Sequence, residues 1–291
     1  MLILTGPTAS GKSDVALVLA RLTGGEIVCA DAFQLYAGLP ILTAQPSAEA
    51  LAAVPHHLYG SVPLEREMDA AAFARIAEDC IAQIECRGKL AIVTGGSGLY
   101  LKALTHGLSP LPPADAALRD ELDALTAEER TARLLALDPA AGDTVALANP
   151  RYVQRALEIT LLTGRPAAEQ RTSFLTGPRH GIRGVFLRRD REELYTRINI
   201  RTLSMLESGA LDEVRALPPE ISATAEKTIG LRELRAVLAG TLSMPDATAA
   251  IQQITRRYAK RQETWFRRET WMETVECTGR GAEEIAEGLL R

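Results

Sequence analysis

The segment between residues 6 and 13 constrains the fold of this 291-residue chain more than any other part of the sequence. It has the form GxxxxGK[ST] and consists of Gly6, Pro7, Thr8, Ala9, Ser10, Gly11, Lys12 and Ser13. An apolar run at residues 1–4 precedes it, and the apolar pattern VALVLARL follows at residues 15–22. A buried strand, a glycine-rich turn and a buried helix in this order are typical of a phosphate-binding loop.

The residue types in this loop fit the binding of a diphosphate or a triphosphate. Glycines allow successive backbone N–H groups to converge on one phosphate at the N-terminus of a helix. Lys12 adds a cation, and the hydroxyl of Ser13 can bind Mg²⁺. The motif therefore predicts a diphosphate or nucleotide site with Mg²⁺ as cofactor, without identifying the ligand.

Further strand-like runs predict that the loop belongs to an α/β fold. Apolar runs at residues 26–30, 90–94 and 185–187 alternate with helical patterns such as residues 73–84. This alternation predicts a parallel sheet core with helices on both faces.

Breaks in the pattern divide the chain into three segments. A proline-rich stretch at residues 108–115 is followed by helical periodicity without a strand-like run. We therefore expect residues 1–112 to form the first part of the phosphate-loop core and residues 113–180 to form an α-helical insertion domain. Residues 181–291 should return to the core and end in helices.

Asp31 follows a buried strand about twenty residues beyond the loop, at the sheet edge where α/β proteins bind ligands. Three roles are open to it: a Mg²⁺ ligand, a general base at an acceptor, or the N-cap of a helix. Its position alone divides the interpretation evenly between capping and chemistry.

Composition bears on location more than on activity. No apolar run approaches the roughly 20 residues of a membrane-spanning helix. The four cysteines lack metal or redox spacing, which favours a reducing compartment, and no secretory leader is recognisable at the start. We expect a cytoplasmic monomer that has no membrane partner.

Several segments, in order along almost the whole chain, resemble the bacterial tRNA dimethylallyltransferase (tRNA isopentenyltransferase) family. They are GPTASGKS from Gly6, DAFQLY from Asp31 with TAQP from Thr43, PHHLYG from Pro55, GGSGLYLKALTHGLSPLP from Gly95, NPRYVQRALEI from Asn149, TIGLREL from Thr228 and AKRQETWFR from Ala259. The chain departs from the family pattern at Ala32, Gln45, Ser97 and Leu231, where serine, lysine, threonine and tyrosine are usual.

The resemblance implies a prenyltransferase that moves the dimethylallyl group of dimethylallyl diphosphate to N6 of the adenosine beside the anticodon of tRNA. The catalytic residues would be Asp31, Ser97 and Lys12. Residues Gly6 to Ser13 would bind the diphosphate together with Arg201, and Ser13 would hold Mg²⁺. The helical insertion at residues 113–180 would bind tRNA. Contacts to the tRNA anticodon stem-loop would come from Asp31, Ala32, Phe33, Gln34, Ser97, Arg119, Arg151, Tyr152, Val153, Gln154, Arg155, Lys227 and Gly230.

Two other functions remain compatible with the loop. A kinase of a small molecule or nucleoside would bind ATP in the loop and use Asp31 at the acceptor hydroxyl. A non-catalytic regulator would need only the loop and ATP. The two differ from the transferase in preferring ATP over dimethylallyl diphosphate.

Overall fold

The computed structural model describes the chain except residues 109–110, 113–114 and 171–176. It divides into two compact units: a core unit of Met1–Thr105 with Pro178–Arg291, and a helical unit, His106–Gly177. These divisions fall a few residues from the boundaries expected after positions 112 and 180. Pro113, the first residue of the expected insertion, lies outside the described residues.

The core unit is built on a six-stranded sheet in the order β3-β2-β4-β1-β5-β6, and every pairing is parallel. The strands are β1 (Leu2–Thr5), β2 (Glu26–Cys29), β3 (His56–His57), β4 (Ala91–Gly95), β5 (Arg183–Arg188) and β6 (Glu273–Glu276). The parallel α/β core predicted from the sequence is confirmed.

Two strands at the sheet edges were not predicted. The sequence favoured only helices after residue 187, yet β6 pairs with β5 there. β6 reads ETVE and is mostly exposed, and β3 has only two residues. Neither strand has the apolar run or the alternation by which a sequence reveals a strand, because edge strands bury little side-chain surface.

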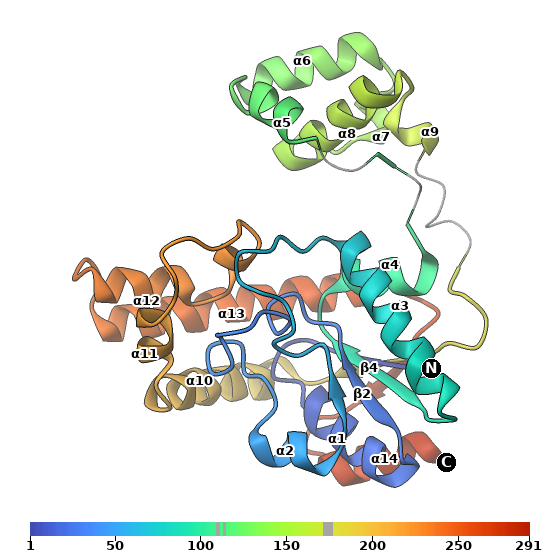
Figure 1. Cartoon of the computed structure of the whole chain (residues 1–291), viewed down its shortest axis with the longest axis vertical. Helices are drawn as coiled ribbons and strands as arrows, with labels where there is room; N and C mark the ends of the chain where they lie inside the picture. The colour runs from blue at the N-terminus through green and yellow to red at the C-terminus, as the bar shows by residue number, and fades with distance from the viewer. Residues whose placement is uncertain (109–110, 113–114, 171–176) are drawn as a thin grey trace. The chain divides into compact units, whose positions relative to one another are not determined.

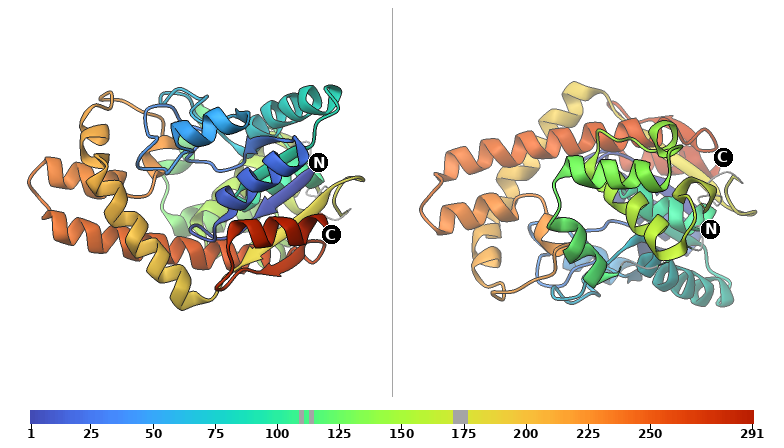
Figure 2. Two further views of the ribbon diagram at one scale, coloured as in Figure 1. Left: turned by 90° about the horizontal axis from the view of Figure 1, so that it is seen from below. Right: turned by 90° about the horizontal axis from the view of Figure 1, so that it is seen from above.

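Helices cover both faces of this sheet (Figures 1 and 2). On one face α1 (Lys12–Thr23) lies beside α14 (Ala282–Leu290), and both pack on alternate residues of the central strands. On the other face Phe186 of β5 stacks on Phe266, with ring centroids 5.8 Å apart. Two more helices, α3 (Ala70–Cys86) and α4 (Gly98–His106), lie in the sequence between β3 and the helical unit.

A second group of helices extends the core unit beyond one end of the sheet (Figure 1). It comprises α10 (Arg191–Glu207), α11 (Ala210–Arg215), α12 (Leu231–Leu238) and α13 (Met244–Phe266). The helix α10 packs on α13, and Ala259 joins Leu194 and Ile198 in a small apolar cluster beside Ala9 of the phosphate loop. This packing brings side chains of α10 and α13 to the loop. A short helix, α2 (Ala48–Ala53), precedes β3.

The helical unit contains α5 (Ala116–Asp123), α6 (Ala127–Leu137), α7 (Ala141–Thr144), α8 (Pro150–Thr163) and α9 (Ala167–Gln170). Local signals set its boundaries: Thr126 and Glu129 form a capping box at α6, and Asn149 caps α8 with proline at its first position. Its core is aliphatic, with Leu122, Leu134 and Leu157 fully buried. Of the helices in the described part of the chain, none is both long and apolar enough to cross a membrane.

A close backbone approach at Gly95 joins the ends of β2 and β4. A Cβ atom at Gly95 would lie 2.1 Å from the carbonyl oxygen of Ala30, so no side chain fits there. Ala30 directly precedes Asp31, and Gly95 lies two residues before Ser97. The close approach of Gly95 to Ala30 therefore sets the distance between the predicted site residues Asp31 and Ser97.

We expect Gly95→Ala to lower the free energy of unfolding by roughly 1–3 kcal/mol, since the added methyl must move backbone. Gly288→Ala is the control: Gly288 lies in α14, and its Cβ would meet only the end of Arg280, at 3.6 Å. This control should be neutral or gain up to about 1 kcal/mol. Urea unfolding followed by circular dichroism measures both, and equal stability of the two variants would contradict the steric argument.

Candidate active site

The phosphate loop connects β1 to α1 and presents the open N-terminus of that helix. Gly11 occupies the N-cap position in the left-handed region, at φ 94°, and no side chain caps α1. The first-turn N–H groups of α1 therefore remain available for an anion. The loop's shape also depends on Gly6, where a Cβ would lie 2.6 Å from Ser10 Oγ.

Two backbone amides of the loop are already bonded inside the protein, so not every residue between Gly6 and Ser13 can offer its N–H group to a diphosphate. The amide of Thr8 donates to Oε1 of Gln262 at 2.8 Å, and the amide of Ser10 donates to the carbonyl of Pro7 at 3.1 Å. The anion-binding part of the loop therefore lies toward the start of α1.

Three arginines, two of them from α10, support consecutive residues of the loop. Arg201 donates to the hydroxyl of Thr8. The Nε of Arg197 donates to the carbonyl of Ala9 at 2.8 Å, and that of Arg189 donates to the carbonyl of Ser10 at 3.2 Å. Ala9 has φ 66°, a conformation that a residue with a side chain adopts at a cost, so these contacts hold the loop in a strained shape.

Charge is concentrated around Lys12. Burial lowers the pKa of the Lys12 ammonium to about 8, against the opposing attraction of Asp31. Burial also lowers the pKa of Arg201 below its ordinary value, again opposed by Asp31. Lys12 and Arg201 are thus two cations that burial has partly removed from water, and they lie beside the open N-terminus of α1. This arrangement favours a ligand with several negative charges.

Asp31 follows β2, and its Oδ1 accepts a hydrogen bond from the amide of Phe33 at 3.1 Å. The residues after it form turns and not an α-helix, so Asp31 closes a local turn; the helix-cap interpretation of this residue is wrong. The hydroxyl of Ser97 accepts from the amide of Ala32 at 2.8 Å. Ser97 therefore holds the turn that carries the carboxylate.

The predicted catalytic residues Asp31 and Lys12 line one pocket of about 80 Å³. Thr8, Ser13, Phe33 and Arg201 also line it.

A second pocket, of about 660 Å³, shares Lys12, Ser13 and Arg201 with the first. Its remaining walls include the apolar side chains of Leu17 and Ile27. The phosphate loop thus borders both pockets, and an anion held at Lys12 is accessible from either.

Unpartnered polar atoms lie at the same place. Among the described residues, the buried hydroxyls of Ser10, Thr94 and Thr228 have no hydrogen-bond partner within the protein. Thr228 lines the first pocket and Thr94 the second. A buried hydroxyl is costly to leave unpaired, which favours a polar ligand here.

Sequence reasoning assigned no role at the phosphate loop to Arg189, Arg197 or Gln262, and none at the pocket to Tyr258. Tyr258 lines the first pocket, and its ring lies 6.1 Å from that of Phe33. Burial raises the pKa of Tyr258, with hydrogen bonds to Ser97 and Gln262 opposing the shift. The signal for α13 was present as tyrosine and tryptophan interleaved with basic residues between positions 256 and 268.

The other predicted RNA-contact residues of the core have mixed placements. Gln34 lines the first pocket, and its Nε2 donates to the carbonyls of Thr43 at 3.0 Å and Ala44 at 2.7 Å. Lys227 is exposed, whereas Gly230 is buried as the N-cap of α12. Gln45, which replaces the usual lysine, donates to the carbonyl of Gln34 at 3.1 Å and thus holds the same loop.

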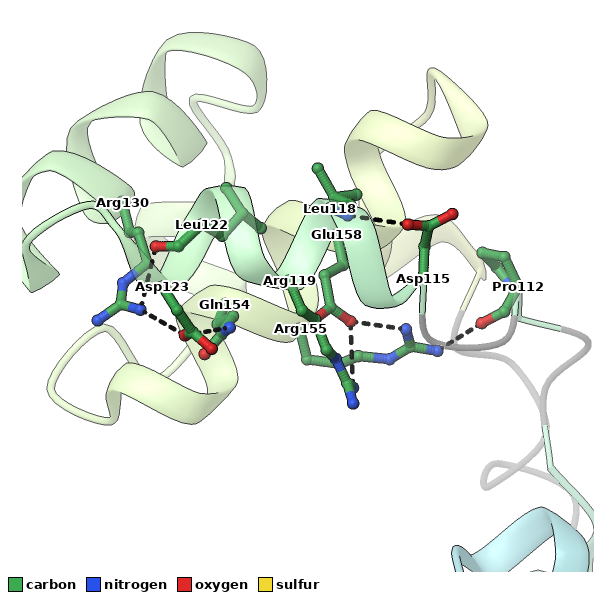
Figure 3. Close-up of polar contacts among 10 residues, drawn as sticks. All are labelled: Pro112, Asp115, Leu118, Arg119, Leu122, Asp123, Arg130, Gln154, Arg155 and Glu158. Atoms are coloured by element: carbon green, nitrogen blue, oxygen red, sulfur yellow. Dashed lines mark hydrogen bonds and ion pairs between the residues drawn. The ribbon is translucent and has the colours of Figure 1, made fainter. Parts of the chain in front are cut away.

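In the helical unit the predicted residues lie on α5 and α8. Figure 3 shows three of them, Arg119, Gln154 and Arg155. Arg151 and Tyr152 are exposed, and Gln154 donates to Asp123 at 2.8 Å. Val153 is a correction: its side chain is buried in the aliphatic core, because helical periodicity turns it away from its exposed neighbours. Arg119 and Arg155 both bond to Glu158.

The described part of the chain contains no metal centre built from His, Cys, Asp and Glu side chains alone. Across the described ranges, no three His, Cys, Asp or Glu side chains are grouped so that they could hold a metal ion. Ser13 is exposed at the start of α1 and lines both pockets. These residues fit a Mg²⁺ ion that arrives with a diphosphate, since Mg²⁺ takes few protein ligands and substrate oxygens for the rest.

The fold and the site define a phosphate-loop enzyme in which a carboxylate faces the loop within one pocket. The chain belongs to the IPP transferase family, whose model matches residues 34–269. A tRNA dimethylallyltransferase of Akkermansia muciniphila is 45% identical over 93% of this chain and 91% of its own length. A tRNA dimethylallyltransferase 1 of Citrifermentans bemidjiense is 43% identical over 94% and 92%.

Solved structures agree with the family. The tRNA isopentenylpyrophosphate transferase of Bacillus halodurans superposes with a TM-score of 0.73 at 31% identity, covering 99% of this chain and 95% of that one. A eukaryotic dimethylallyltransferase acting on tRNA superposes with a TM-score of 0.81 at 26% identity, covering 96% and 74%. The family resemblance predicted from the sequence motifs is confirmed.

The lowered pKa of Lys12 predicts a pH-dependent affinity for pyrophosphate. An anion stabilises the ammonium form, so binding should be strongest below about pH 8. Above that pH, affinity should fall by up to about tenfold per pH unit as the free protein loses the proton. Calorimetric titration between pH 7 and 9.5 measures this dependence.

Lys12→Met is the control, because it removes the titrating group and nearly preserves the length of the side chain. The variant should bind pyrophosphate weakly and retain only the pH dependence of the ligand itself. Parallel profiles for the two proteins would show that Lys12 does not bind the anion.

Proposed function

We propose that this protein transfers the dimethylallyl group from dimethylallyl diphosphate to N6 of the adenosine adjacent to the anticodon in tRNA. The observation that carries the proposal is that Asp31 and the phosphate loop line one pocket. The allylic carbon of a diphosphate bound at the loop would therefore lie within reach of a nitrogen nucleophile that hydrogen-bonds to Asp31. The activities named for the relatives support the same reaction.

The loop would bind the leaving group. When the allylic C–O bond breaks, its electron pair remains on the departing pyrophosphate, where negative charge increases. Lys12, Arg201 and the first-turn amides of α1 would stabilise that charge as it develops, which accelerates the step itself. Ser13 would hold Mg²⁺, which when bound offsets further charge on the pyrophosphate.

Asp31 would act on the acceptor. The N6 amine is a weak nucleophile, and a carboxylate that accepts its hydrogen bond orients it and takes up the proton released when the N–C bond forms. One oxygen of Asp31 accepts from the amide of Phe33, which fixes the carboxylate plane. Ser97 would support this arrangement through the amide of Ala32.

The adenine must leave its stack to reach the pocket, so RNA contacts should surround the pocket mouth. Phe33, Gln34, Tyr258 and Thr228 border the pocket and present aromatic and polar groups suited to a base. We further propose that the protein acts as a monomer in the cytoplasm.

The transferase and kinase hypotheses predict different products. Full-length protein is incubated with an anticodon stem-loop, Mg²⁺ and radiolabelled dimethylallyl diphosphate, and in parallel with radiolabelled ATP. We expect prenyl transfer to the stem-loop only, and none when the target adenosine is replaced by guanosine, which lacks the N6 amine. Phosphate transfer from ATP, or equal prenylation of free adenosine, would contradict the proposal.

Replacing the acceptor carboxylate tests its role directly. Asp31→Asn keeps the size of the side chain but cannot take up a proton, so kcat should fall by roughly 10²- to 10⁴-fold. The melting temperature should stay within a few degrees, because the amide oxygen of asparagine can still accept from the backbone N–H of Phe33. Steady-state prenyl transfer and thermal melting measure the two effects.

The matched control is Asp69→Asn, because Asp69 also accepts a backbone hydrogen bond, from Ala72 at 2.7 Å, as the N-cap of α3. This variant should be slightly less stable and fully active. An Asp31→Asn enzyme that behaves in the same way would reduce Asp31 to a structural residue.

A further inference from the structure

A buried acid in the helical unit holds two of the arginines predicted to contact RNA (Figure 3). Glu158 of α8 has 1% of its side chain exposed. Its Oε1 accepts from Nε of Arg119 at 2.6 Å, and its Oε2 accepts from a terminal nitrogen of Arg155 at 3.0 Å. A single carboxylate thus joins α5 to α8.

Other ion pairs described on this unit differ in kind. They are Arg130–Asp123, Arg133–Glu121 and Arg165–Glu169, and their acidic side chains are between 56% and 63% exposed. Exposed pairs of this type contribute little to stability. A buried carboxylate instead carries a large desolvation cost, and an apolar residue of similar size often packs at least as stably. Fold stability alone therefore gives a weak reason for an acid at position 158.

The arrangement orients the two guanidinium groups. Each is planar and donates along one edge to Glu158, which fixes its rotation. Arg155 also donates to the carbonyl of Pro112 at 2.7 Å, so both ends of its guanidinium are held. The side chains of Arg119 and Arg155 nevertheless remain 43% and 29% exposed. Two cations share one anion, so the cluster retains a net positive charge at the surface.

We propose that Glu158 is a positioning residue of the RNA-binding surface. It holds Arg119 and Arg155 in the orientation that meets backbone phosphates of the tRNA stem-loop, and it does not touch the RNA itself. Because the arginines are already ordered, less side-chain entropy is lost on binding, and the complex is tighter. This inference rests on the proposed function.

Substitutions at Glu158 separate positioning from simple charge. Glu158→Gln removes the negative charge and makes the protein more positive by one unit. If Glu158 only neutralised the arginines, this variant would bind RNA more tightly at low salt. Positioning predicts the opposite sign, a Kd for the stem-loop that rises roughly three- to tenfold. Glu158→Asp keeps the charge but shortens the reach, so it should weaken binding as well.

The enzyme assay adds a readout that a purely structural role would not change. KM for the stem-loop should rise with Kd, while kcat at saturating RNA and KM for dimethylallyl diphosphate stay at wild-type values. Arg119→Ala should cost less affinity in the Glu158→Gln background than in the wild type, because its orientation is already lost. Glu121→Gln is the matched control on the same unit and should leave Kd and KM unchanged.

The outcomes are distinct. Tighter or unchanged RNA binding by Glu158→Gln and Glu158→Asp, measured by filter binding well below their melting temperatures, would overturn the positioning role. Additive effects of the Glu158 and Arg119 substitutions would overturn it as well. Failure of the proposed function would instead appear in the wild-type protein, as an absence of prenyl transfer to the stem-loop.

Discussion

The strained backbone of the phosphate loop is the feature on which the site depends. Ala9 adopts a left-handed conformation without being glycine, and Gly11 follows in the same region. This backbone path leads into the uncapped N-terminus of α1, and such a path persists because its surroundings hold it. Those surroundings are Arg189 just beyond the end of β5, Arg197 of α10 and Gln262 of α13, all far away in the sequence.

The order of the chain follows from this constraint. The loop begins at residue 6, but the side chains that hold it come from residues 189 to 262. The helical unit interrupts the core between these two parts, so the site is complete only once the chain returns from it. Packing of α10 against α13 is therefore a condition for the chemistry, even though neither helix contains the phosphate-loop motif.

Local sequence determined what could be predicted. The loop, its flanking strand and helix, and Asp31 could be identified because each depends on neighbours in the chain. The arginine contacts could not, since a guanidinium reaches a carbonyl only after tertiary packing. Arg119 and Arg155 show a related limit: the family resemblance assigned both to RNA contact, but their shared partner Glu158 became apparent only when α5 and α8 were placed together. The exposed strand β6 lacked any burial pattern to predict it.

The arginines that hold the loop and the lysine within it have different roles in the site. A guanidinium is a rigid planar donor suited to holding backbone carbonyls, whereas a buried ammonium changes its pKa readily. Lys12, at the centre of that framework, is buried and has a pKa of about 8. Alkaline conditions should therefore remove the charge of Lys12 while the hydrogen bonds that shape the loop remain, and a bound anion should restore the proton.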